Sequence, residues 1–344
     1  MMLFKNILTL MVICFGILTT DAKGNNKTGH ISGSSRRIGS LADESSIRTN
    51  QPIIGILAQE ATGKISKEVS GQYIEGSYVQ MVESAGARVV PVLINQSPHQ
   101  ILKIFNSING LLLPGGHVKL QKSGYGRVGK MLYEMAVKSN QQGQPFPIWA
   151  ECLGLELIAL LASGRGLARG QYDTELLDHT DTKQYSKPLD LSSDYKQSQL
   201  LSSADHAMIQ YMTKALNAFN NHDKGLTPEK YQKFPSLKAD FRIVSTNKDR
   251  KGKVYISTLE GRKYPFFLFH WHPNKARFDW VAGEPVDHSQ ESVYIAQYLT
   301  RLFVNLARTN NHRFASPQEE QAALLQNYTP KKIEDGRFIY HFDM

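Results

Sequence analysis

The chain has 344 residues, of which 41% are hydrophobic, 10% aromatic and 21% charged. This composition is typical of a folded globular enzyme or binding protein, and it excludes fibrous, low-complexity and wholly disordered proteins. The formal net charge of +9 would suit a polyanionic ligand. Because the basic residues are dispersed, and their densest run at 248–253 is typical of a turn between two strands, we do not expect nucleic-acid binding.

The N-terminus has the pattern of a secretory signal peptide. Lys5 precedes an apolar stretch from Ile7 to Leu18, and small residues follow near Ala22. We expect residues 1–22 to be removed, and we expect no membrane span, because about 12 apolar residues fall short of the roughly 18 that a membrane helix needs. The next segment, up to residue 51, is rich in Gly, Ser, Asn and Thr, which predicts a flexible arm.

Only two cysteines are present, Cys14 and Cys152. Cys14 lies in the expected signal peptide, so the mature chain is expected to carry one thiol and no internal disulfide. A lone cysteine in an exported protein is a candidate reactive thiol. The alternative is an inert core residue, because free cysteine is among the most buried residue types.

From Pro52 onward, apolar runs of strand length alternate with segments of helical period. The predicted strands are 52–58, 88–94, 108–113 and 146–150, and the helices between them contain residues 74–85, 98–106 and 128–135. Strands that are apolar on both faces indicate a parallel sheet covered on both sides. The predicted fold class is therefore α/β, with a doubly wound, mostly parallel sheet.

The pattern weakens beyond Gly166 and recovers in the last third of the chain. An antiparallel pair is predicted at 241–246 and 254–259, then a last strand at 264–270 and a helix whose apolar stripe includes Ile295 and Phe303. We expect one domain over residues 52–314 and a C-terminal tail over residues 315–344, where the period is weak.

Cys152 lies at a junction between strand and helix. The strand that ends at Ala150 is followed by Glu151, Cys152 and Leu153, and then directly by a helical apolar run. Such an elbow presents a nucleophile at the carboxyl edge of a sheet, where the helix amino end lowers a thiol pKa and offers N–H groups to an oxyanion. This placement favours a catalytic cysteine over an inert one.

A cysteine nucleophile needs a base, and His272 is the best placed of 11 histidines. It ends the last predicted strand, where Pro273 imposes an extended backbone, so its imidazole is expected at the same sheet edge as Cys152. His270 shares its face, which leaves a metal pair as an alternative. No further ligands cluster nearby in the sequence, so we expect no metal. A third strand ends in Gly115 and Gly116, whose backbone can approach a ligand closely.

Five segments together resemble the folate γ-glutamyl hydrolase family, which is related to class I glutamine amidotransferases. They cover residues 52–314 in order, and they are PIIGILA, YIEGSYVQMVESAGARVVPV, INGLLLPGG, CLGLE and FHWHPNKARFDW. The resemblance implies a glutamine amidotransferase-like domain that needs no cofactor and cleaves poly-γ-glutamate from folates. It also implies a homodimer.

The same resemblance implies roles for individual residues. Cys152 would be the nucleophile and His272 the proton-transfer residue. The oxyanion donors would be Gly116 and Leu153, and the substrate-binding residues would be Tyr73, Glu156 and His222.

The sequence departs from the family pattern at three places. Ala150 and Glu151 stand where relatives have Gly-Thr, His270 stands in place of Gln, and Asn274 replaces a glutamate two residues after the histidine. Asn274 can still serve as the orienting residue for His272, since asparagine does so in papain-like proteases. Glu151 would raise the thiol pKa unless it points away.

Two other functions stay open. A catalytically impaired relative would bind folates or γ-glutamyl peptides without turnover, which the changes at Glu151 and Asn274 allow. A glutaminase domain of an amidotransferase would share the elbow and the histidine, although the signal peptide argues against it. Secretion, or delivery to a lysosome or vacuole, is the expected location, and Asn-x-Ser/Thr sites at Asn26, Asn95 and Asn327 fit an exported glycoprotein.

Overall fold

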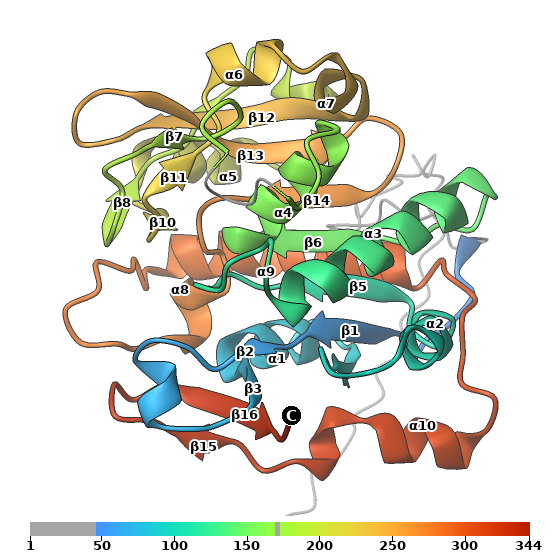
Figure 1. The fold of residues 1–344 in the computed structure, drawn as a ribbon. Coiled ribbons are helices and arrows are strands. Elements are labelled where there is room, and N and C mark those ends of the chain that lie inside the picture. Colours follow the sequence, from blue (N-terminus) through green and yellow to red (C-terminus); the bar gives the residue numbers. More distant parts are fainter. Residues whose placement is uncertain (1–45, 169–172) are drawn as a thin grey trace, which may run out of the picture. The chain divides into compact units, whose positions relative to one another are not determined.

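An eight-stranded sheet forms the centre of the computed structural model, which describes residues 46–168 and 173–344 (Figure 1). Its first five strands are parallel, and the last three continue it in antiparallel fashion. In spatial order the strands are β4 (Arg88–Val92), β1 (Ile53–Leu57), β5 (Gly110–Leu113), β6 (Ile148–Glu151), β14 (Phe266–Phe269), β13 (Val254–Gly261), β12 (Phe241–Lys248) and β9 (Asp190–Leu191).

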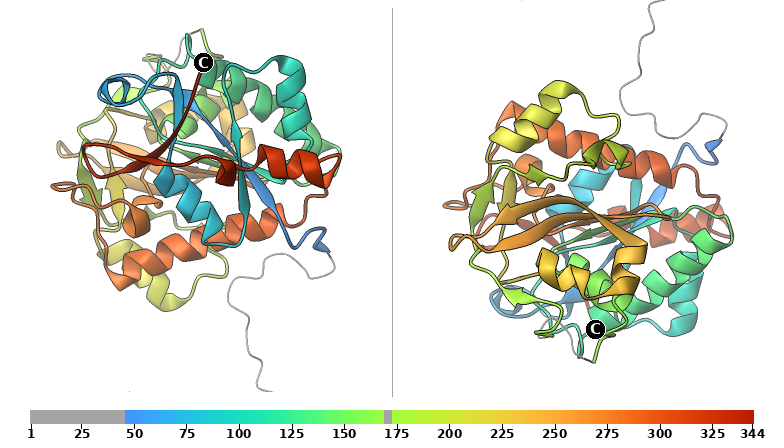
Figure 2. Two further views of the ribbon diagram at one scale, coloured as in Figure 1. Left: turned by 90° about the horizontal axis from the view of Figure 1, so that it is seen from below. Right: turned by 90° about the horizontal axis from the view of Figure 1, so that it is seen from above.

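Helices cover both faces of this sheet, so the predicted doubly wound, mostly parallel α/β fold is confirmed (Figure 2). Successive residues of a strand point to opposite faces. Ile148 and Ala150 therefore pack in one hydrophobic cluster, and Trp149 packs in the other. The first cluster includes α2 (Pro98–Phe105), α3 (Gly124–Gln141) and α4 (Leu153–Ala162), and the second includes α1 (Gly76–Glu83), α5 (His206–Lys214) and α9 (Gln290–Ala307).

The first predicted helix differs at its start. Residues Gln72–Glu75 form strand β3, and α1 begins only at Gly76. β3 pairs with β2 (Gln59–Glu60) and with the C-terminal strand β16 (Phe338–Phe342), which pairs with β15 (Lys331–Lys332). Glycine is a weak helix former, so Gly76 does not favour extending the helix toward residue 72, and Glu75 before it has an extended backbone.

The C-terminal segment also differs from the expected tail. It forms α10 (Pro317–Ala323) and the β15–β16 hairpin, whose turn contains Asp335 and Gly336, the latter with φ of +91°. An Asp-Gly pair is a strong hairpin signal because glycine adopts positive φ without strain. Ile339 is fully buried, so the hairpin is part of the folded domain.

The polar stretch after α4 contains short elements that its weak period did not predict. Two small antiparallel pairs form there: β10 (Ala218–Asn220) with β8 (Tyr185–Lys187), and β11 (Lys224–Gly225) with β7 (Asp178–His179). The remaining helices are α6 (Pro228–Gln232), α7 (Pro235–Asp240) and α8 (Lys275–Phe278), with 3₁₀ turns at Ile65–Lys67, Tyr195–Gln197 and Leu325–Asn327.

The expected signal peptide and most of the expected arm lie outside the described residues. Within residues 46–168 and 173–344, no helix is long and apolar enough to cross a membrane.

Candidate active site

Cys152 occupies a strained turn between β6 and α4, as the sequence predicts. Its backbone has φ of 49° and ψ of −104°, an unusual conformation for a residue with a side chain. Its N–H donates to the carbonyl oxygen of Phe269 at 2.7 Å, and its own carbonyl accepts from Glu156 at 3.0 Å. A Cβ on Gly154 would lie 2.5 Å from the carbonyl oxygen of Leu113, so glycine lets the helix start close to β5.

The glycine turn after β5 lies directly against this elbow. A Cβ on Gly115 would lie 3.0 Å from His272 Cε1 and 3.2 Å from Cys152 Cβ. The N–H of Gly115 donates to Tyr78 Oη at 2.9 Å, which fixes the turn. A Cβ on Gly116 would collide with the buried side chain of Gln59, so glycine at this position allows the close approach.

His272 follows β14 and reaches the same sheet edge. Its N–H donates to the carbonyl oxygen of Phe219 at 2.9 Å. Cys152 and His272 line one cavity of about 600 Å³, together with Tyr73 and Gly116. Burial lowers the pKa of His272 well below its usual range, so the resting imidazole is neutral and able to accept a proton.

Cys152 is 6% exposed, and this burial dominates the pKa of its thiol. Burial raises the pKa of Cys152, and the nearby Glu156 carboxylate raises it further. A hydrogen bond from the N–H of Leu153 at the helix start lowers it, but this effect is the smaller one. The helix terminus therefore lowers the thiol pKa as predicted, but burial outweighs it and the net pKa is raised.

A second cavity of about 290 Å³ is also lined by Cys152. It contains two of the predicted substrate-binding residues, Glu156 and His222, and it also contains Leu153. His222 stacks on His270, with ring centroids 3.6 Å apart, and its Nδ1 lies 2.7 Å from the carbonyl oxygen of Lys224. Burial lowers the pKa of His222 well below its usual range.

The two strand-end histidines have different surroundings. His270 packs against His222, with its Nε2 3.8 Å from Glu156 Oε1, whereas His272 lines the larger cavity. Among the residues that the structure describes, no group of three or more His, Cys, Asp or Glu could hold a metal ion.

Asn274, predicted to orient His272, makes its hydrogen bond elsewhere. Its Nδ2 donates to Ser77 Oγ at 3.0 Å. The carboxyl group nearest to His272 belongs instead to Glu151, whose Oε2 lies 3.4 Å from Nδ1 of His272. Burial raises the pKa of Glu151 well above its usual range.

A profile of the Peptidase C26 family matches residues 52–274. The chain belongs to this family. Proteins named γ-glutamyl hydrolase are similar to it over most of their length: the one from Homo sapiens is 38% identical over 85% of this chain and 90% of its own, and the one from Bos taurus is 39% identical over 81% and 85%. γ-Glutamyl hydrolase B of Dictyostelium discoideum is 33% identical over 82% and 79%.

The solved structure of a putative GMP synthase protein from Thermoplasma acidophilum aligns with a TM-score of 0.41 and 14% identity. The alignment covers 80% of this chain and 99% of the other.

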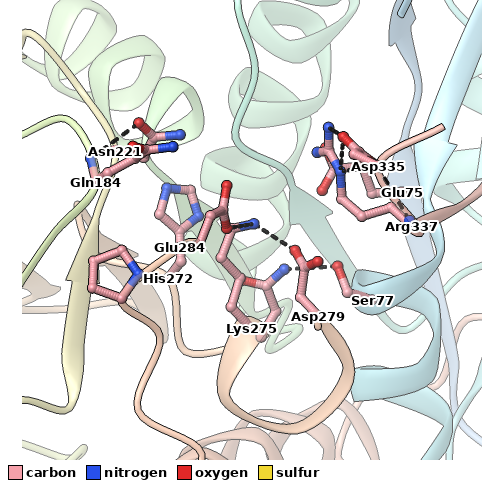
Figure 3. Close-up of polar contacts among 12 residues, drawn as sticks. Glu75, Ser77, Gln184, Asn221, His272, Lys275, Asp279, Glu284, Asp335 and Arg337 are labelled. Atoms are coloured by element: carbon pink, nitrogen blue, oxygen red, sulfur yellow. Dashed lines mark hydrogen bonds and ion pairs between the residues drawn. The ribbon is translucent and has the colours of Figure 1, made fainter. Parts of the chain in front are cut away.

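Sequence reasoning missed a cluster of charged residues in this C26 family site. Lys275 pairs with Asp279 and Glu284, and Arg337 pairs with Glu75 and Asp335 (Figure 3). Except for Asp279, these side chains line the larger cavity. Arg337 comes from the C-terminal hairpin, and the Asp335-Gly336 turn signal was the one clue in the sequence that could have identified it.

Proposed function

We propose that the chain is a cysteine hydrolase that cleaves γ-glutamyl amide bonds, with folate poly-γ-glutamates as its substrates. The observation that carries this proposal is the placement of Cys152 on a strained elbow, beside His272 and the glycine turn, in one cavity. The similarity to proteins named γ-glutamyl hydrolase supports the choice of bond.

In the proposed reaction, the Sγ of Cys152 attacks the γ-carbonyl carbon while His272 takes the thiol proton. A bond from sulfur to carbon forms, and the carbonyl π electrons move to oxygen, where the N–H groups of Leu153 and Gly116 would hold the oxyanion. The C–N bond then breaks, and His272 gives its proton to the leaving amine.

Hydrolysis of the resulting thioester completes the cycle. Water adds to the acyl carbon as His272 accepts one of its protons, and the C–S bond breaks. The thiolate recovers the proton from His272, and the γ-carboxylic acid is released. Every proton is carried by groups of the chain or by water, so the scheme calls for no cofactor.

The raised thiol pKa is compatible with this scheme because the proton need not leave before substrate binds. Burial holds Cys152 as a neutral thiol and His272 as a neutral imidazole in the resting protein. Proton transfer at the moment of attack avoids forming an isolated thiolate in a buried position. Substrate in the larger cavity excludes water and strengthens the oxyanion interactions.

Secretion, or delivery to a lysosome or vacuole, remains part of the proposal and rests on the signal pattern at residues 1–22. The side chains at Asn95 and Asn327 are exposed, as glycan attachment would need, while Asn26 lies outside the described residues. Association into a homodimer is proposed only from the family resemblance.

A binding protein without turnover is the second candidate, because Cys152 has a raised pKa and Asn274 is engaged with Ser77. A substrate panel separates the possibilities: pteroyl-tri-γ-glutamate, its α-linked isomer and free glutamine. We expect turnover of the γ-linked compound alone. Ammonia release from glutamine would indicate a glutaminase, and tight binding of the γ-linked compound with no product would indicate the binding protein.

A further inference from the structure

The carboxyl group of Glu151 is fully buried and only partly hydrogen-bonded. Its Oε1 accepts from Trp149 Nε1 at 3.0 Å, but its Oε2 has no hydrogen-bond partner. Nδ1 of His272 is also buried without a hydrogen-bond partner, and these two atoms lie 3.4 Å apart. Two unpaired polar atoms in a buried site are each costly, and a hydrogen bond between them would satisfy both.

Strand register explains why these two groups meet. β6 and β14 are parallel neighbours, with Glu151 opposite Phe269, so a side chain at position 151 lies beside the chain as it leaves β14 toward His272. Trp149 and Glu151 are two residues apart and share a face, which leaves Ala150 on the other. An acid at this position therefore faces the histidine rather than solvent.

Other polar and charged groups also lie near Glu151 and His272, but those that could accept a hydrogen bond from His272 Nδ1 do not lie as close to it as Glu151 does. Lys275, Glu75 and Tyr78 face Glu151, while Lys275, His270 and His117 face His272. Lys275 is paired with Asp279 and Glu284, and Glu75 is paired with Arg337. Asn274 is bonded to Ser77, and its Oδ1 has no partner.

We propose that Glu151 is the positioning residue of the site, accepting the Nδ1–H of His272 and so aiming Nε2 at Cys152. The orienting acid of this chain would then be Glu151, directly before Cys152 at the end of β6, and not a residue two positions after His272. The catalytic part of this inference rests on the proposed hydrolase function, but the orientation of His272 does not and is measurable without substrate.

The proposal makes a prediction of definite sign for the thiol. A carboxylate that acted only as a neighbouring charge would repel the thiolate and raise the Cys152 pKa, so its removal would make the thiol more reactive. Burial raises the pKa of Glu151 while His272 is neutral, but an imidazolium beside it favours the carboxylate. A carboxylate that acts through His272 then stabilises the imidazolium and hence the thiolate, so its removal makes the thiol less reactive.

The first test is the rate of alkylation of Cys152 by iodoacetamide between pH 5 and 9, followed on the peptide that contains it. We expect Glu151→Gln to slow alkylation about tenfold at neutral pH. Glu260→Gln is the matched control, because Glu260 is a buried carboxylate on β13 that bonds Ser198 and the backbone of Leu200. An unchanged or faster rate in Glu151→Gln would overturn the proposal.

A measurement on the wild-type protein covers the case in which Glu151→Gln does not fold. Nitrogen-15 chemical shifts of His272, assigned by their loss in His272→Asn, report which ring nitrogen carries the proton. The proposal requires the proton on Nδ1. A proton on Nε2 would mean that a protonated Glu151 donates to Nδ1, and this would contradict it.

Catalysis then separates the two proposals. With pteroyl-tri-γ-glutamate, Glu151→Gln is expected to lower kcat about 100-fold and to change KM less than threefold. Wild-type-like kcat in Glu151→Gln, with activity still dependent on Cys152, would overturn the positioning role and leave the hydrolase intact. A wild-type protein without turnover, but with the expected alkylation difference, would overturn the hydrolase and leave the positioning role intact.

Discussion

Two cavities of different construction meet at Cys152. The larger, of about 600 Å³, contains His272 and the charged side chains of Lys275 and Arg337. The smaller, of about 290 Å³, contains His222 and Glu156. Both include Cys152 and Gly116, so the thiol and one proposed oxyanion donor lie where the cavities join.

The difference between the cavities indicates a division of labour around the scissile bond. The larger cavity is walled by β3, α8 and the C-terminal hairpin, and its ion pairs hold charges in fixed positions. The smaller one is built on the segment with short strands after α4, and its wall includes His222, whose ring stacks on His270 and whose Nδ1 lies 2.7 Å from the carbonyl oxygen of Lys224. A hydrolase must hold both sides of an amide bond, and a nucleophile at the junction of two cavities is suited to that task.

The largest expected effect comes from His272, which transfers protons in the reaction and is not expected to bind the substrate in either cavity. His272→Ala removes the group that takes and returns the proton, so kcat is expected to fall about 10³-fold or more with KM changed less than threefold. Steady-state kinetics on pteroyl-tri-γ-glutamate measure this. A kcat within tenfold of wild type would show that another group transfers the proton.

The next effect tests the larger cavity. Arg337→Ala leaves the carboxylates of Glu75 and Asp335 unpaired beside the substrate, and its own charge is lost. Since the substrate carries carboxylates, KM is expected to rise about tenfold with little change in kcat. Lys332→Ala, an exposed change in the same hairpin, is the control and is expected to leave KM and kcat unchanged. Equal KM values for the two variants would remove Arg337 from the binding site.

A smaller effect is expected in the smaller cavity. His222→Gln loses the stacking on His270 but keeps a polar side chain, so KM is expected to rise about threefold. The matched control is His341→Gln, an exposed change on β16 away from this cavity. If His222→Gln instead lowers kcat as strongly as the His272 variant, the smaller cavity takes part in chemistry as well as in binding.

The smallest effect concerns stability against pH. Because burial lowers the folded-state pKa of His222 and of His272, each stays neutral in the folded chain while the unfolded chain takes up protons below pH about 6.5. The free energy of unfolding therefore falls with decreasing pH, by up to about 1.4 kcal/mol per pH unit for each histidine. Urea unfolding at pH 6.5 and 5.5 measures this, and His222→Gln should show a smaller loss than wild type. Equal losses would contradict neutral burial of His222.

The sequence predicted the parts of the site that follow local rules. Cys152, His272 and Gly116 each follow the carboxyl end of a strand of an apolar parallel sheet, and such ends share one edge. Arg337 was missed because its place depends on β16 pairing with β3, more than 260 residues earlier in the chain. The carboxyl or amide group beside His272 could not be predicted either. The sequence places both Asn274 and Glu151 at the same sheet edge as His272, and only the packing of the folded chain decides which side chain faces the ring.

The most direct test of the central claim is hydrolysis of pteroyl-tri-γ-glutamate by the wild-type protein and by Cys152→Ala, with the products separated by chromatography. We expect release of glutamate or its short γ-linked oligomers by the wild type, and loss of that activity in the variant with substrate binding retained. Equal product formation by both proteins would contradict the role of Cys152 as nucleophile and with it the proposed reaction.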